Sequence, residues 1–402
     1  MPSLASFDRD WEPAAFLTGL TAFVWFAFGA LPLHIGVSVQ LGLTAAQTSS
    51  WVFIVWLMSS LPTLALVLYY RQPIFVGWTI PGLLYLGTLA GEFSYPEMMG
   101  ANLMAGVLFL FVAVLGLGER IMTWLPLPIV MGMFGGSILA YITRTVGIIV
   151  DDLAVGGVTV AGYLVGRAIG SRRVPPVGLA VIAGSIAVAF SGTLALGTVP
   201  WGLPTVIVPD MDFTFAAFVA ISLPLVVMAM GLGNVQGLGF LMAQGYRVPV
   251  NTVTIVTGLC SIINAAFGGH PATVTRTGTA LLASPEAGPL PSRYWGAVTA
   301  AVLTLLIAFG AGSVAALVAI LPRGFIVVLT GVAILSSFQD ALEKAFGGAM
   351  RFGALTAFAV AATPFEIFGI TSAFWAILAG IAGSLLAERG ELLRYWRGAG
   401  AN

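Results

Sequence analysis

Two ionisable residues, His270 and Arg276, lie in a segment that otherwise has the composition of a membrane interior, GGHPATVTRTGTALLASPE over residues 268–286. A titratable or charged side chain at membrane depth is costly to hold and marks a candidate functional site. Pro271 and the β-branched residues after it favour extended backbone, so a helix begins only near Arg276. Irregular backbone survives at this depth only around a cavity or inside protein. We therefore predict a broken helix whose free N-terminus faces a ligand.

A second segment, QPIFVGWTIPG over residues 72–82, has the same character. Thr79 occupies a helix N-cap position and Pro81 follows in the first turn. Two half-helices meeting near the midplane would direct two positive dipole ends at one place, which favours an anion. The alternative is a proline kink in a continuous helix. The predicted binding residues are Phe28, Phe75, Thr79, Ile80, Asn234, Gln236, Thr275, Arg276 and Thr277.

The composition identifies a polytopic membrane protein, because 59% of residues are hydrophobic, 8% are charged and the mean hydropathy is +1.02. Sixteen basic and sixteen acidic residues cancel, so no basic surface indicates a nucleic acid partner. A single cysteine, Cys260, cannot form an internal disulfide or a thiolate metal cluster. The sequence shows no nucleophile and base pair and no nucleotide loop. We expect a protein that is not an enzyme and that has no metal or cofactor.

Hydropathy over windows of about 20 residues predicts an all-α protein with fourteen spans. Residues 1–191 hold spans 1–7, residues 192–212 form a connector along the membrane surface, and residues 213–402 hold spans 8–14. An odd number of spans in each half makes the two halves inverted repeats. The predicted spans are 14–33, 47–69, 74–91, 97–117, 126–149, 152–170, 175–191, 213–233, 249–267, 268–285, 293–313, 317–339, 350–363 and 366–386, of which the third and tenth are broken and preceded by short strands.

The basic residues support this count, since short cytoplasmic loops collect Lys and Arg. With both termini in the cytoplasm, only Arg144 and Arg323 fall outside, and Arg276 stays in the membrane. The predicted inner set is Arg9, Arg71, Arg120, Arg167, Arg172, Arg173, Arg247, Arg293, Lys344, Arg351, Arg389, Arg394 and Arg397.

Several motifs resemble the benzoate/proton symporters of bacteria, a family with the fourteen-span, inverted-repeat fold of the nucleobase and sulfate/bicarbonate transporters. The resemblance implies a bacterial inner-membrane protein with a core domain of spans 1–4 and 8–11 and a gate domain of spans 5–7 and 12–14. It also implies a substrate site between spans 3 and 10, alternating access, and a homodimer through the gate domains. The motifs are Trp78-Thr-Ile-Pro-Gly82, Gly245-Tyr-Arg-Val-Pro-Val-Asn251, Thr257-Gly258-Leu259, Phe267-Gly-Gly-His270, Pro285-Glu-Ala287 and Gly369-Ile-Thr-Ser-Ala-Phe-Trp375.

The tenth span departs from that family. In the benzoate/proton symporters the residues after Gly-Gly-His are apolar. In this sequence Pro271-Ala-Thr-Val-Thr-Arg-Thr-Gly278 adds an arginine and hydroxyls, and Thr275-Arg276-Thr277 looks like the Ser-Arg-Ser/Thr of sulfate permeases. The eighth span has Asn234-Val-Gln-Gly237 in place of Asn-Met-Pro-Gly. The leading hypothesis is a secondary active transporter of benzoate or a related aromatic carboxylate. A transporter of bicarbonate, sulfate or a short carboxylate is the alternative, and a nucleobase transporter or a channel is less well supported.

The coupling ion is expected to be H⁺, with Na⁺ left open. No Asp or Glu falls in the middle of a predicted span, so the usual carboxylate relay is missing. The proton would travel on the substrate, on His270, on His34 near the outer mouth, or on Glu92 at the end of the third span. The alternative interpretation is that His34 is a solvated or capping residue.

Overall fold

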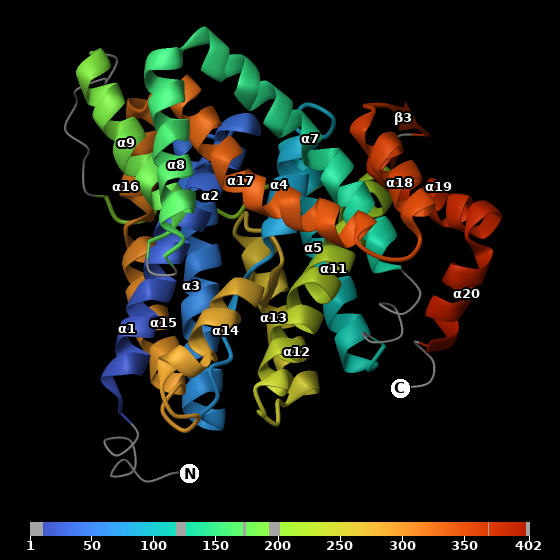
Figure 1. Cartoon of the computed structure of the whole chain (residues 1–402), viewed down its shortest axis with the longest axis horizontal. Coiled ribbons are helices and arrows are strands. Elements are labelled where there is room, and N and C mark those ends of the chain that lie inside the picture. The colour runs from blue at the N-terminus through green and yellow to red at the C-terminus, as the bar shows by residue number, and fades with distance from the viewer. Residues whose placement is uncertain (1–10, 118–125, 172–173, 193–201, 369, 399–402) are drawn as a thin grey trace.

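The computed structural model describes residues 11–117, 126–171, 174–192, 202–368 and 370–398, and the fold is almost entirely helical (Figure 1). Four of the predicted inner basic residues, Arg9, Arg120, Arg172 and Arg173, lie outside the described residues, as do Gly369 and residues 193–201 of the connector.

The first half contains α1 (Pro13–Trp25), η3 (Phe26–Ala30), α2 (Leu31–Gln40), α3 (Ala45–Tyr70), β1 (Val76–Trp78), α4 (Ile80–Thr88), α5 (Tyr95–Val114), α7 (Leu127–Asp151), η4 (Leu153–Gly157), α8 (Val158–Ile169) and α9 (Pro176–Ser191). The eighth predicted span is built from α10 (Phe215–Ala217), η5 (Phe218–Ser222), α11 (Leu223–Val227), η6 (Met228–Val235) and α12 (Gln236–Ala243). The chain continues with α13 (Val250–Ala266), β2 (Ala272–Val274), α14 (Arg276–Leu282), η7 (Pro285–Ala287), α15 (Tyr294–Phe309), α16 (Ala311–Ile320) and α17 (Arg323–Phe346). It ends with α18 (Arg351–Ala362), β3 (Glu366–Ile367), β4 (Ile370–Thr371), α19 (Ser372–Ala387) and α20 (Arg389–Gly398). The elements η3 to η6 are π-helical, and η7 is a 3₁₀ turn.

Among the described residues, six helical stretches are long and apolar enough to cross a membrane. The pair α15 and α16, bent by 57°, passes the same test as one broken span. Five shorter apolar helices accompany them, beginning at Leu153, Pro176, Val250, Arg351 and Ser372. This protein therefore crosses the membrane many times.

The long helices begin at local sequence signals. Thr44 accepts a hydrogen bond from the backbone N–H of Gln47, whose side chain returns to the Thr44 N–H, and Ser94 and Glu97 make the same reciprocal pair at the start of α5. Such capping boxes satisfy backbone N–H groups that a helix leaves without partners.

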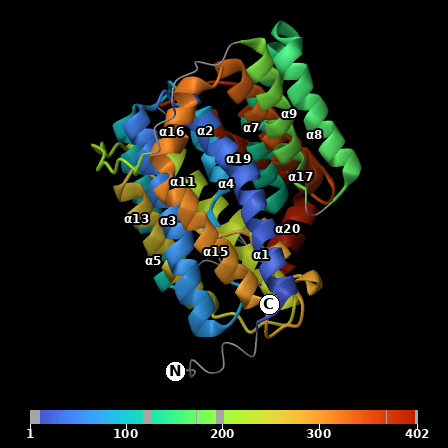
Figure 2. The same cartoon turned by 90° about the vertical axis from the view of Figure 1, so that its left-hand side faces the viewer.

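The helices contact one another in two main groups. In one, α3 packs against α15 and α13, α15 against α1, and α5 against α13. In the other, α7 packs against α17, α18 and α19, while α8 and α9 stand side by side at one edge in both views (Figures 1 and 2). The groups meet where α2 crosses α17, at Gly36. A Cβ atom there would lie 1.8 Å from Oγ1 of Thr330, so only glycine allows this approach.

Two short strands form the centre of the first group. β1 and β2 pair antiparallel with Gly77 opposite Thr273, and each strand leads into a short helix, as the sequence analysis predicted for the third and tenth spans. Side chains of neighbouring helices satisfy backbone groups that the two-stranded pair leaves open. Thr63 accepts from the N–H of Val76, and Ser261 accepts from the N–H of Ala272. Extended backbone is stable here because it is buried in protein.

The twelfth predicted span needs correction. The sequence analysis placed it at residues 317–339, but the chain breaks before Pro322 and α17 continues to Phe346. Asp340 and Lys344 therefore lie within a helix, and Lys344 is not in an inner loop. Charged residues ended the hydropathy window early, whereas the helix continues because those residues pair with each other.

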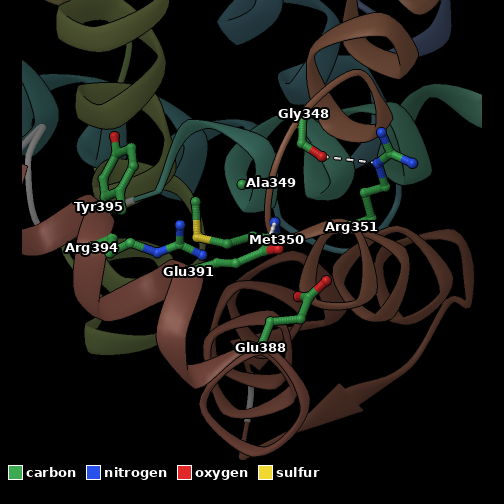
Figure 3. Close-up of a pocket in the computed structure, with 8 residues that line it drawn as sticks. All are labelled: Gly348, Ala349, Met350, Arg351, Glu388, Glu391, Arg394 and Tyr395. Atoms are coloured by element: carbon green, nitrogen blue, oxygen red, sulfur yellow. Dashed lines mark hydrogen bonds between the residues drawn. The ribbon is translucent and has the colours of Figure 1, made fainter.

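The last helix, α20, was not predicted. Glu391 of α20 and Glu388, the residue just before it, lie close to the start of α18 (Figure 3). Glu391 accepts a hydrogen bond from the N–H of Met350 at 2.5 Å, and Glu388 accepts from the N–H groups of Phe352 and Gly353 at 2.7 and 3.0 Å. Negative charge stabilises a helix N-terminus. An open hollow of about 670 Å³ adjoins these residues, and its carboxylates are occupied in holding α18.

Candidate functional site

A cavity of about 330 Å³ lies where both half-helices begin, between the strand pair and α17. Its lining comes from η3 and α2, from the starts of α4 and α14, and from α7, η6, α12 and α17. The lining residues include Phe26, Gly29, Leu33, Trp78, Thr79, Ile80, Gln236, Thr275, Arg276, Thr277, Ser336, Ser337, Asp340 and Lys344.

One wall of the cavity is aromatic and apolar. The ring of Phe26 lies 4.8 Å from the ring of Phe75 and 6.1 Å from that of Trp78, measured between centroids. Leu33 from α2 and Phe134 from α7 extend this wall. Rings in offset or edge contact hold one another in place, so the wall presents a rigid apolar surface to a ligand.

A second wall of the cavity is charged. Nη1 of Arg276 donates to Oδ1 of Asp340 at 2.8 Å, and Nζ of Lys344 donates to Oδ2 of Asp340 at 2.9 Å. Both cations also reach Oε1 of Gln236, at 3.4 Å from Arg276 and 3.0 Å from Lys344. Two cations and one carboxylate give this wall a formal charge of +1. The Arg276 side chain is 42% exposed, so it is open to the cavity.

The half-helices begin at the cavity with backbone bonds that link them. The N–H of Thr79 donates to the carbonyl of Pro271 at 3.3 Å, and the N–H of Thr275 donates to the carbonyl of Phe75 at 3.0 Å. These reciprocal bonds place both helix starts side by side. Positive dipole ends and backbone N–H groups at such starts favour an anion.

Six of the predicted binding residues come together in the cavity. They are Thr79, Ile80, Gln236, Thr275, Arg276 and Thr277.

Three predicted residues lie elsewhere. Phe28 is 37% exposed and lies beside Gly178 of α9, while Phe75 is fully buried behind Phe26. Asn234 is buried and holds β2, since its Oδ1 accepts from the N–H of Val274 at 2.7 Å and from the hydroxyl of Thr273 at 3.0 Å. Phe75 and Asn234 therefore support the cavity without lining it.

The proton-coupling candidates also occupy different places. His34 and His270 are buried, at 1% and 0% exposure, one layer behind the cavity wall. The interpretation of His34 as a solvated residue is thus wrong: it is buried on α2 among the aromatic rings of Trp51, Trp56 and Trp78. Glu92 lies in an exposed turn after α4, away from the cavity lining.

Sequence reasoning missed Phe26, Trp78, Asp340 and Lys344 as lining residues. Ser336, Asp340 and Lys344 recur every fourth residue, which places them on one face of a helix. That spacing, followed through the end of the predicted span, is the signal that identifies the charged wall.

Comparisons with known proteins agree with this architecture. The family model described as "Benzoate membrane transport protein" matches residues 9–386. The chain is 29% identical to inner membrane protein YdcO of Escherichia coli over 360 residues, covering 88% of this chain and 91% of that protein. It is 23% identical to the benzoate membrane transport protein of Acinetobacter baylyi over 391 residues, covering 94% and 96% of the two chains.

Solved structures share the fold at low sequence identity. The transmembrane domain of the cyanobacterial bicarbonate transporter BicA gives a TM-score of 0.57 at 15% identity, covering 95% of this chain and 97% of that one. The murine anion transporter Slc26a9 in its inward-facing state gives a TM-score of 0.62 at 14% identity, covering 95% of this chain and 69% of that one. The family match spans nearly the whole chain, and this multi-pass membrane protein belongs to the benzoate membrane transport protein family, whose members are transporters and not enzymes.

Proposed function

We propose that this protein is a secondary active transporter of benzoate or a related aromatic carboxylate, moved together with a proton by alternating access. The observation that carries the proposal is a small cavity that has both an aromatic wall and a charged wall of net charge +1. Its volume of about 330 Å³ suits a small ligand. The name of the Acinetobacter baylyi relative supports the same substrate class.

The geometry gives each part of such a ligand a partner. The ring packs against Phe26 and Trp78, and the carboxylate takes the guanidinium of Arg276. Arginine grips a carboxylate in two places because its donors form a planar fork. Asp340 occupies that guanidinium in the structure, so the incoming carboxylate replaces it.

Alternating access follows from where the ion pair lies. Arg276 begins α14 in the helix group around the strands, whereas Asp340 belongs to α17 in the group around α7. We assign these groups to core and gate domains. Exchanging Asp340 for substrate loosens one connection between them, which couples binding to movement.

The topology in this proposal has fourteen spans in two inverted repeats. Counted over the described residues, six long stretches, one bent pair, five shorter apolar helices and the two half-helices α4 and α14 supply a segment for each of the fourteen spans. Antiparallel pairing of β1 with β2 supports an inverted relation between the halves. Both termini are placed in the cytoplasm of a bacterial inner-membrane protein, with a homodimer through the gate domains.

A small anion such as bicarbonate is the second candidate. The observation in its favour is the start of α14, where Thr275, Arg276 and Thr277 surround the cavity with hydroxyls and a charge that do not require an aromatic ligand.

A substitution at position 29 distinguishes an aromatic carboxylate from a small anion as the substrate. A Cβ atom at Gly29 meets nothing within 4 Å, and Gly29 lines the cavity, so Gly29→Leu fills space that a benzoate ring needs. We expect benzoate affinity to fall about tenfold or more, since overpacking costs about 1–3 kcal/mol. Affinity for bicarbonate or formate should change by less than about threefold.

Binding is measured by calorimetry on purified protein, with Gly147→Leu as the matched control because Gly147 is an open, exposed helical position outside the cavity lining. A parent protein that binds bicarbonate or formate and ignores benzoate contradicts the aromatic carboxylate assignment.

A further inference from the structure

The chain contains two histidines, and the fold brings them together. His34 of α2 and His270, just before β2, have ring centroids 5.5 Å apart. Both side chains are buried, and His34 contacts Trp78, which lines the cavity. The ring of Trp78 lies 5.2 Å from that of His34.

The hydrogen bond of His34 fixes its tautomer. Nδ1 of His34 lies 3.0 Å from the carbonyl oxygen of Ala30. A carbonyl oxygen only accepts, so Nδ1 carries the hydrogen. In the neutral ring Nε2 then has a free lone pair. Nε2 is buried and has no hydrogen-bond partner among the described residues.

The hydrogen bond of His270 fixes the opposite tautomer. Nε1 of Trp51 lies 2.9 Å from Nδ1 of His270. The indole nitrogen only donates, so Nδ1 must accept and Nε2 carries the hydrogen. That Nε2 atom also lacks a described partner. The side chain of Asn264 holds the backbone here by donating to the carbonyl of His270 at 3.0 Å.

These two hydrogen bonds leave one ring nitrogen of the two histidines with a free lone pair, Nε2 of His34. A proton on His270 would have to displace the Trp51 hydrogen bond, whereas a proton on His34 displaces nothing.

The surroundings admit at most one added charge. The ring centroids of Trp51, Trp56 and Trp78 lie 6.3, 6.1 and 5.2 Å from that of His34, so only Trp78 lies within the distance of about 6 Å at which an aromatic ring attracts a cation. These indoles do not titrate, and among the ring contacts and side-chain hydrogen bonds of the described residues each histidine has the other as its one ionisable neighbour. A second proton would meet the charge of the first.

We propose that His34 and His270 form a site for one proton, with Nε2 of His34 as the acceptor and His270 as its neutral, tautomer-locked neighbour. Binding breaks one O–H bond of a hydronium ion and forms one N–H bond at the His34 lone pair, which leaves the ring as a cation and releases water; release of the proton reverses this step. As an account of coupling the site rests on the proposed function. The proton lies one indole layer behind the anion, so each stabilises the other and each raises the affinity for the other.

The proton site is tested without substrate. In protein labelled with ¹⁵N-histidine, two rings give two sets of signals, assigned with His34→Gln and His270→Gln. We expect an Nδ1–H tautomer for His34, an Nε2–H tautomer for His270, and uptake of one proton, on His34, as the pH falls. Two rings of the same tautomer, or a first proton on His270, would overturn the proposal.

A matched pair of tryptophan variants tests whether Trp51 fixes the tautomer of His270. Trp51→Phe removes the donor to His270 and should produce a mixture of His270 tautomers. Trp56→Phe should leave them unchanged, because Trp56 contacts His34 and its Nε1 has no described hydrogen-bond partner. A His270 tautomer that is unaffected by Trp51→Phe contradicts the assignment.

Coupling is tested in proteoliposomes. His34→Gln should abolish uphill accumulation of benzoate driven by a pH gradient, while exchange of benzoate across the membrane falls by less than about threefold. Accumulation equal to that of the parent would overturn the coupling role. A parent that neither binds nor moves benzoate would overturn the proposed function instead, and the tautomer measurements would still decide the proton site.

Discussion

The two half-helices that meet at the cavity share a four-residue plan and differ in chemistry. The first begins Thr79-Ile-Pro-Gly82 after β1, and the second begins Thr275-Arg-Thr-Gly278 after β2. Ile80 and Arg276 are thus the first helical residues of α4 and α14. The equivalence became visible only through the strand pairing.

The starts of α4 and α14 differ in how their backbone N–H groups are satisfied and in the charge that they carry. The hydroxyl of Thr79 accepts from the N–H of Gly82 at 3.2 Å, and Pro81 has no N–H, so α4 largely satisfies its own start. Thr275 makes no such cap, and the second start adds a guanidinium. The first half-helix provides shape and the second provides charge.

The largest expected effect comes from removing the charge. Arg276→Ala should weaken benzoate binding about tenfold to a hundredfold, since a charge-assisted contact contributes about 1.5–3 kcal/mol. Ile80→Ala, the matched change in α4, should weaken it less than about fivefold. Calorimetry on both variants tests this, and equal losses would mean that the two starts are not specialised. Arg276→Lys should recover little, because an ammonium lacks the planar fork.

A smaller effect is expected from removing the competitor of the ligand. Asp340→Asn frees Arg276 and raises the positive charge of the cavity, so benzoate should bind about twofold to fivefold more tightly, in line with about 0.2–1 kcal/mol for a partly exposed pair. The control is Glu343→Gln on the same helix, whose carboxylate accepts from Gln339 outside the cavity lining. Weaker binding by the Asp340 variant would show that the carboxylate orients Arg276 instead of competing for it.

The smallest effect concerns stability. Thr79→Val removes a helix cap and should lower the free energy of unfolding by about 1 kcal/mol. Thr275→Val removes no cap and should lower it by less than about half of that. Thermal unfolding in detergent measures both, and an equal loss would indicate that the hydroxyl of Thr275 caps α14 in solution.

Local signals explain what the sequence could predict. Gly, Pro and β-branched residues act on the backbone nearest to them, so both broken spans and the position of Arg276 at a helix start follow from the segments themselves. Phe26 and Phe28 are a different case, because a π-turn in η3 changes which side chain faces inward. No hydropathy window detects that turn.

Tertiary contacts explain what the sequence could not predict. From the sequence alone Asn234 is a candidate substrate-binding residue, yet its side-chain oxygen accepts a hydrogen bond from the backbone of β2. His34 is polar and lies next to a helix break, but its burial depends on aromatic rings from α3 and β1. Asp340 reaches the cavity only because α17 crosses the start of α14.

The glycines of the cavity have a consequence for how this family can change. Gly233 and Gly278 are fixed, since a Cβ atom would lie 1.7 Å from the hydroxyl of Thr273 and 2.4 Å from that of Thr275, respectively. Gly29 faces open space and can accept a side chain without moving a neighbour. A single codon change at position 29 therefore alters the size of acceptable ligands while leaving the fold intact. Among the three glycines that line this cavity, Gly29 is therefore the one at which a substitution can change specificity without disturbing the packing around its Cβ.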